Sequence, residues 1–235
     1  MKILSLVYAG NIEWFCHLLG GDCVIDIYEH YHKQSYRNRC EIMTAGGVTP
    51  LSVQVVKPDN RYKAAVRDVR IDYSKRWQHR HWTSIASAYR NSPYFDHYAG
   101  VLEPFYRRRF DFLADLNIEL LYVLLDALGA DVRPRFSERY IEVGGEQGAT
   151  GAGGGYEVAG ESGGGRIIDL RDTLSPKARL ARRDPRFAPQ EYYQVFSDRI
   201  PFAPNLSVID LLLCEGPGAM EVLRGSCLLS SPQKK

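Results

Sequence analysis

The sequence has little net charge and no long apolar run. Its 30 basic and 28 acidic residues leave a formal charge of +2, which provides no overall attraction to nucleic acid or to an anionic membrane. Any anion must therefore be bound locally. No stretch approaches the length needed to span a bilayer, and Asn11 and Glu13 interrupt the short apolar run at the N-terminus. We expect a buried first strand, no membrane span and no nucleic-acid partner.

Paired cysteines are absent too. The cysteines are odd in number and scattered, and none forms a Cys-x-x-Cys pair, which argues against a disulfide framework and a zinc ribbon. We predict free thiols in a reducing, cytoplasmic compartment for all of them. They are Cys16, Cys23, Cys40, Cys214 and Cys227.

Two common catalytic or phosphate-binding motifs are also missing. No Gly-x-Ser-x-Gly elbow occurs, which argues against the commonest class of serine hydrolases. Half of the residues from 144 to 165 are glycine, but no Lys-Ser or Lys-Thr ends this segment, so it is not a phosphate loop. It carries too little apolar surface to offset its ordering entropy. We predict a single domain over residues 1–235, with a flexible insertion at about 144–165 and a frayed tail at 229–235.

The hydrophobic pattern predicts an α+β fold. Short apolar or alternating runs, from "KILSLVY" to "VRDVRIDY", fill the first third and are separated by glycines and turn residues. They predict an N-terminal mixed sheet of four to six strands, packed with four or more helices. Trp82, Ile85 and Tyr89 share one helical face, Gly129 is a helix stop, and Asn205 or Ser207 caps a late helix.

A cluster of cations stands in the stretch "YHKQSYRNRC", residues 31–40. If this stretch is extended, Lys33, Arg37 and Arg39 project from the same face. Like charges so close together need an anion among them, either a ligand's phosphate or carboxylate or an internal carboxylate. The internal candidates are Asp26, Glu29, Asp72 and Asp210. Both alternatives are open at this stage.

Several blocks of the sequence together resemble the WbqC-like family of bacterial proteins. These blocks are "HKQSYRNRC", "IDYSKRW", "HRHWTSIASAYRNSPYFDHY", "FLADLN", "YYQVF" and "PNLSVIDLLLCEGP". The resemblance covers most of the chain outside the glycine-rich segment, and it implies an association with O-antigen, surface-polysaccharide or amino-sugar genes. It implies no catalytic mechanism. Relatives usually have histidine before the Pro-Lys that matches Pro176-Lys177, where this chain has Ser175.

Two residues are candidates for acid-base chemistry. His81 lies on the predicted helix beside the Trp82 face, and Asp72 lies at a predicted strand end. Each also has a structural interpretation, as a hydrogen-bonding histidine or as a turn-capping aspartate. The histidine spacing supplies no metal site, and no cofactor is indicated.

We therefore hypothesise an enzyme of bacterial surface-glycan or amino-sugar metabolism, with polysaccharide biosynthesis and a transferase reaction as the specific suggestion. An anionic sugar or other small molecule would be the substrate, with His81 and Asp72 catalytic. The predicted substrate-binding residues are Lys33, Arg37, Asn38, Arg39, Tyr193, Gln194, Asn205 and Asp210. The alternative is a non-catalytic protein that binds a glycan precursor or a protein partner, and the sequence gives no oligomeric state.

Overall fold

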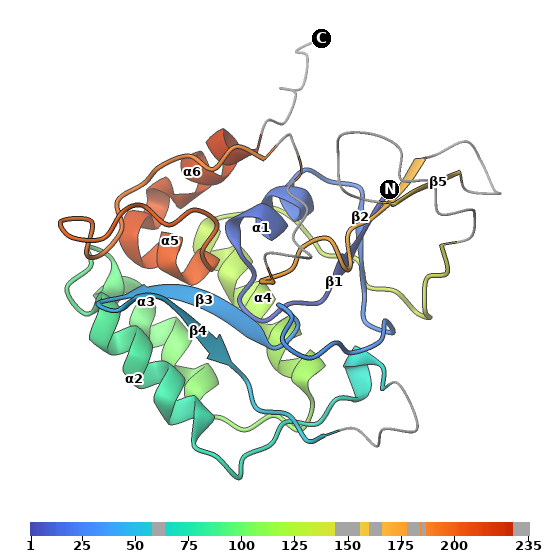
Figure 1. Cartoon of the computed structure of the whole chain (residues 1–235), viewed down its shortest axis with the longest axis horizontal. Helices are drawn as coiled ribbons and strands as arrows, with labels where there is room; N and C mark the ends of the chain where they lie inside the picture. Colours follow the sequence, from blue (N-terminus) through green and yellow to red (C-terminus); the bar gives the residue numbers. More distant parts are fainter. Residues whose placement is uncertain (58–63, 144–155, 160–165, 178–183, 185–186, 228–235) are drawn as a thin grey trace.

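The described part of the chain has an α+β fold, which confirms the predicted class (Figure 1). The computed structural model describes residues 1–57, 64–143, 156–159, 166–177, 184 and 187–227. The strands are β1 (Lys2–Ser5), β2 (Cys23–Asp26), β3 (Arg39–Thr44), β4 (Gly47–Ser52), β5 (Tyr156–Ala159) and β6 (Arg166–Asp169). The helices are α1 (Ile12–Leu19), α2 (Trp77–Tyr89), α3 (Phe95–Leu102), α4 (Leu113–Leu128), α5 (Val208–Glu215) and α6 (Ala219–Ser226).

The larger sheet has the strand order β2-β1-β6-β5. β1 lies at its centre and pairs in parallel with both β2 and β6, while β5 is antiparallel to β6. The helix α1 connects β1 to β2, so the first 26 residues form a β-α-β unit. The carboxyl ends of β1, β2 and β6 therefore lie at the same edge of this sheet.

The predicted single N-terminal sheet of four to six strands is not found. β3 and β4 form a separate two-stranded antiparallel sheet, while the neighbours of β1 are β2 and, from far along the chain, β6. The expected strand "VRDVRIDY" is instead a short 3-10 helix, Val66–Asp68, followed by isolated bridges at Arg70 and Ile71.

Capping residues define several helix ends. Ser207 is the N-cap of α5 and accepts a hydrogen bond from the backbone of Ile209, as predicted. Gly129 ends α4 in the left-handed conformation. Gly216 ends α5 with a φ of 53°, and a Cβ at this position would clash with the Tyr94 ring, so only glycine fits.

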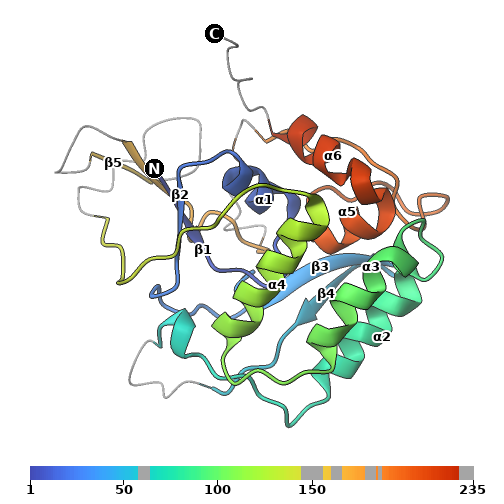
Figure 2. The same cartoon turned by 180° about the vertical axis from the view of Figure 1, so that it is seen from behind.

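The elements pack around a single apolar cluster that includes residues of both sheets and of all six helices. Figures 1 and 2 show α4 running through the middle of the molecule, with α2 and α3 beside the β3–β4 hairpin. None of the described helices is long and apolar enough to cross a membrane.

A disulfide joins Cys16 in α1 to Cys227, just after α6, with 5.4 Å between the two Cα atoms. The prediction of five free thiols is therefore wrong for this pair. Cys23, Cys40 and Cys214 are free and buried. Local sequence patterns do not reveal this pairing, because the two cysteines are 211 residues apart. Such bonds are rare in reducing compartments, and the cytoplasmic location remains a prediction.

The structure describes only residues 156–159 of the glycine-rich segment. Its residues 144–155 and 160–165, and the predicted frayed tail at 229–235, lie outside the described residues. Inside the predicted insertion, Tyr156–Ala159 forms β5 and pairs along its whole length with β6. The expected insertion thus contains an edge strand of the larger sheet.

Candidate functional site

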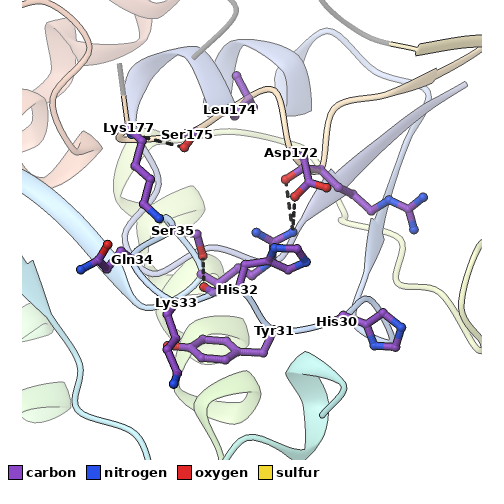
Figure 3. A pocket seen from close by; sticks show the side chains of 12 residues that line it. His30, Tyr31, His32, Lys33, Gln34, Ser35, Asp172, Leu174, Ser175 and Lys177 are labelled. Atoms are coloured by element: carbon purple, nitrogen blue, oxygen red, sulfur yellow. Dashed lines mark hydrogen bonds and ion pairs between the residues drawn. The ribbon is translucent and has the colours of Figure 1, made fainter. Parts of the chain in front are cut away.

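A pocket of about 590 Å³ lies next to the carboxyl ends of the parallel strands. Two chain segments form it: the turn region before β3 and the segment that follows β6 (Figure 3). Its lining residues are His30, Tyr31, His32, Lys33, Gln34, Ser35, Arg37, Arg171, Asp172, Leu174, Ser175 and Lys177. The carboxyl edge of parallel strands is the usual place for ligands in such sheets.

Buried ionic contacts at the strand ends hold one side of this pocket. Arg171, just beyond β6, pairs with Asp26 at the end of β2 and with Asp169 at the end of β6. Its carbonyl oxygen accepts hydrogen bonds from Ser5, at the end of β1, and from Arg37. All three parallel strands therefore converge on Arg171, and its side chain is fully used for this structural purpose.

Arg37 is also buried and paired, with the carboxylate of Glu29. Its Nε donates to Glu29 Oε1 at 3.0 Å, and its Nη2 donates to Oε2. Ser5 donates to the same carboxylate. Burial raises the pKa of the Glu29 carboxyl, and the neighbouring Arg37 acts in the opposite direction. Arg37 is thus largely a structural residue, although its guanidinium also contacts Asp172 in the pocket lining.

Open charges line the rest of the pocket. The ammonium groups of Lys33 and Lys177 have no carboxylate partner among the described residues. Asp172, whose side chain is 68% exposed, contacts Arg37 Nη2 at 3.3 Å. In Figure 3, Lys177 points from the segment after β6 toward Ser35, and Asp172 lies across from it. The described lining therefore combines two free lysines with a single exposed carboxylate.

Tyr31 adds an aromatic surface to the pocket. Burial raises the pKa of its phenol to about 12, against the influence of Arg37 and Arg39. The hydroxyl therefore stays protonated at neutral pH and is able to donate a hydrogen bond. No described residue accepts from it, so the group is free to bind a ligand oxygen.

The extended cationic face predicted for residues 31–40 is not formed. Gln34 has a φ of 58°, and the backbone turns between His32 and Asn38. The strand begins only at Arg39. The turn places Lys33 and Arg37 at the pocket, whereas Arg39 donates from Nε to Ser52 Oγ at 3.1 Å within the β3–β4 hairpin. The buried amide of Asn38 donates to the carbonyl of Val53.

The remaining predicted binding residues do not line the pocket. Gln194 is buried and hydrogen-bonds both to the N–H and to the C=O of Ala203, so it clamps a loop. Asn205 bonds to the side chain and the backbone N–H of Glu13. Tyr193 is an exposed side chain whose backbone N–H donates to Glu215. These contacts are structural, and a binding role for these residues remains a prediction.

Asp210 forms a separate buried centre. It is fully buried at the start of α5 and accepts hydrogen bonds from the hydroxyls of Tyr89 and Tyr192. Burial raises the pKa of its carboxyl to about 6, and the two phenols partly compensate. The contact joins α2 to α5 across the hairpin, since Tyr89 also accepts from the backbone N–H of Met43.

His81 and Asp72, the predicted acid-base pair, do not line the pocket. They also have different hydrogen-bond partners. His81 is buried, with Nδ1 3.0 Å from the hydroxyl of Tyr8, which in turn donates to Tyr106. Burial lowers the pKa of its imidazole to about 4. Asp72 instead caps a turn by accepting from the backbone N–H of Ser74. No hydrogen bond or ion pair in the described part of the chain joins the two residues.

Sequence reasoning noted Ser175 and Pro176-Lys177 only as a departure from the family, and it did not predict that residues 171–177 form the second half of the pocket. The signal was the "LRD" that directly follows the strand "RIID", because polar residues at a strand's carboxyl end often form sites. Lys177 follows Ser175, whose hydroxyl accepts from its backbone N–H. Among the described residues, no group of three or more histidine, cysteine or acidic side chains is arranged to hold a metal ion.

Comparison with known protein families decides the relationship. A model of the WbqC-like protein family matches residues 23–222, which include both pocket segments. The chain belongs to the WbqC-like family. Searches of curated proteins and of solved structures each gave no significant match. Family membership therefore rests on the sequence match, and the geometry described above must carry the functional argument.

Proposed function

We propose that this chain binds an anionic small molecule, through a phosphate or carboxylate group, in the pocket formed by residues 30–37 and 171–177. The observation that carries the proposal is the charge of the lining. Lys33 and Lys177 have no carboxylate partner among the described residues, and the exposed Asp172 is a single opposing charge. Cationic side chains gathered in a concave site favour a phosphate or carboxylate ligand.

The ligand class that we propose is a precursor of a bacterial surface glycan. Resemblance to the WbqC-like family supports this class, since the family is associated with surface-polysaccharide and amino-sugar genes. The Tyr31 ring and its free hydroxyl suit a sugar, which offers both an apolar ring face and hydroxyl groups. A sugar phosphate or a sugar acid would satisfy the charges and the aromatic surface together.

Binding is better supported than group transfer. The predicted acid-base pair of a transferase, His81 and Asp72, does not line the pocket, although His30 and His32 do. His81 is also held neutral by burial and is already engaged with Tyr8. We therefore propose the non-catalytic alternative, with Lys33 and Lys177 as the ligand-binding cations.

Calorimetric titration with glucose 1-phosphate tests this proposal. Lys177→Ala should weaken binding by about tenfold or more, because a charge-assisted hydrogen bond contributes about 1.5–3 kcal/mol. Lys75→Ala is the matched control, since Lys75 is an exposed lysine outside the pocket lining. Glucose and glucuronate serve as neutral and carboxylate probes. Absence of binding by both anionic probes, or equal weakening by the two lysine variants, would contradict the proposal.

A further inference from the structure

The Arg37 guanidinium presents two edges, and they are used very differently. One edge, formed by Nε and Nη2, makes two hydrogen bonds to the buried carboxylate of Glu29. This fork-to-fork geometry is the strongest form of an arginine–carboxylate pair. Removal of either partner would leave a buried charge uncompensated, so this edge is permanently committed to the fold.

The other edge, formed by Nη1 and Nη2, is only partly satisfied. Nη2 donates to Asp172 Oδ1 at 3.3 Å and to the carbonyl oxygen of Arg171 at 3.2 Å. No described residue accepts a hydrogen bond from Nη1, and this atom is not among the buried polar atoms without a partner. The edge thus has an unused N–H on Nη1 beside an N–H on Nη2 that is shared between two long contacts.

Asp172 forms only a weak ion pair with this edge of Arg37. Its side chain is 68% exposed, whereas that of Glu29 is 4% exposed. A solvent-exposed ion pair contributes only about 0–1 kcal/mol. Asp172 uses one carboxylate oxygen where the edge is shaped for two, so a group with two oxygens would bind there with better geometry.

We propose that Asp172 is an internal counter-ion, and that the phosphate or carboxylate of the ligand displaces it from the Nη1–Nη2 edge of Arg37. This inference rests on the proposed function of the same pocket. In the bound state the ligand's oxygens take both N–H groups, and Lys177, on the opposite side of the pocket, balances the added charge. The Asp172 side chain then rotates into solvent, to which most of it is already exposed.

Displacement makes Asp172 a specificity-determining residue. A neutral sugar brings no charge to replace the Asp172 carboxylate at the guanidinium, so this ion pair favours anionic over neutral ligands. The negative charge of Asp172 also opposes every anion that binds nearby. Its removal should therefore strengthen anion binding, which is the opposite of what removal of a ligand-contacting residue would do.

The test is calorimetric titration of Asp172→Asn with inorganic phosphate and, separately, with acetate, at constant ionic strength. We expect at least one probe to bind about two- to fivefold more tightly. This factor corresponds to the free energy of an exposed ion pair, which the ligand no longer has to break. Tightening for phosphate alone identifies a phosphoryl ligand, and tightening for acetate alone identifies a carboxylate ligand. Asparagine keeps the size of the side chain, so folding is preserved.

Asp198→Asn is the matched control, because Asp198 is 66% exposed and contacts Arg199 at 3.1 Å outside the pocket lining. It changes the net charge equally and should leave both affinities unchanged. Unchanged or weaker binding by Asp172→Asn, or equal tightening by the control, overturns the inference. If Lys177→Ala still loses binding in that case, the pocket's function stands without it. If the native chain binds no anion, both proposals fail.

Discussion

Replacement of His81 by glutamine tests how the buried core depends on pH. The imidazole is buried between Tyr8, Trp77 and Tyr106, bonds to Tyr8 and to the backbone of Ser52, and its pKa is lowered from 6.5 to about 4. The folded state therefore disfavours the charged ring. The stabilising contribution of the neutral ring is fully present above about pH 6.5, and acid removes it as the pH falls toward about 4.

The magnitude follows from these two pKa values. Between about pH 6.5 and pH 4, each unit by which the pH falls lowers the free energy of unfolding by about 1.4 kcal/mol. The reason is that His81 binds a proton in the unfolded chain but not in the folded chain. Between pH 7 and pH 5 the cost reaches about 2 kcal/mol. Asp210 acts in the opposite direction, since its pKa is raised to about 6 and its protonation favours the fold. The pH dependence of the native chain alone mixes both effects.

Urea unfolding at both pH values therefore compares the native chain with His81→Gln. The variant loses hydrogen bonds, so it should be less stable at pH 7. The stability gap should shrink by about 2 kcal/mol at pH 5, because glutamine takes up no proton. His79→Gln, on an exposed position of the same helix, shows how much of the change comes from losing any histidine. A gap that stays constant or widens on acidification would refute the reasoning.

Two further predictions concern the backbone and the disulfide. Gly216→Ala should cost about 2–4 kcal/mol in urea unfolding, because it adds left-handed strain to a clash with Tyr94. Gly129→Ala, with a φ of 65° and no atom within 4 Å, should cost only about 1 kcal/mol, and equal costs would argue against the clash. Cys227→Ser should lower the stability by about 3–5 kcal/mol without reductant. Dithiothreitol should abolish that difference, and a difference that persists under reduction would mean that the bond is not its cause.

Local signals in the sequence predicted the parts of the fold that local physics controls. The Ser207 cap, the Gly129 stop and the apolar face of α2 depend on residues within one or two helical turns, and all three are found. The partner of a strand is a different matter. The sequence did not reveal that β6 completes the sheet beside β1, because that pairing joins residues more than 160 positions apart.

The candidate site shows the same limit. Lys33 and Arg37, which were predicted to bind substrate, both line the pocket, but their relative orientation depends on a left-handed turn at Gln34. Alternation along a strand was therefore the wrong geometry. Arg171 and Lys177 reach the pocket from a segment far along the chain. Only the folded structure tells which arginine is committed to a buried carboxylate and which cation remains open.

The bond between Cys16 and Cys227 turns most of the polypeptide into a closed covalent ring. A protease that cuts the backbone once between these residues opens the ring without releasing a fragment, so the product has nearly the native mass until a reductant is added. Complementary halves made by such a cut would stay tethered through α1 and the end of α6. The ring thus keeps both pocket segments on one molecule even after the backbone between them is broken.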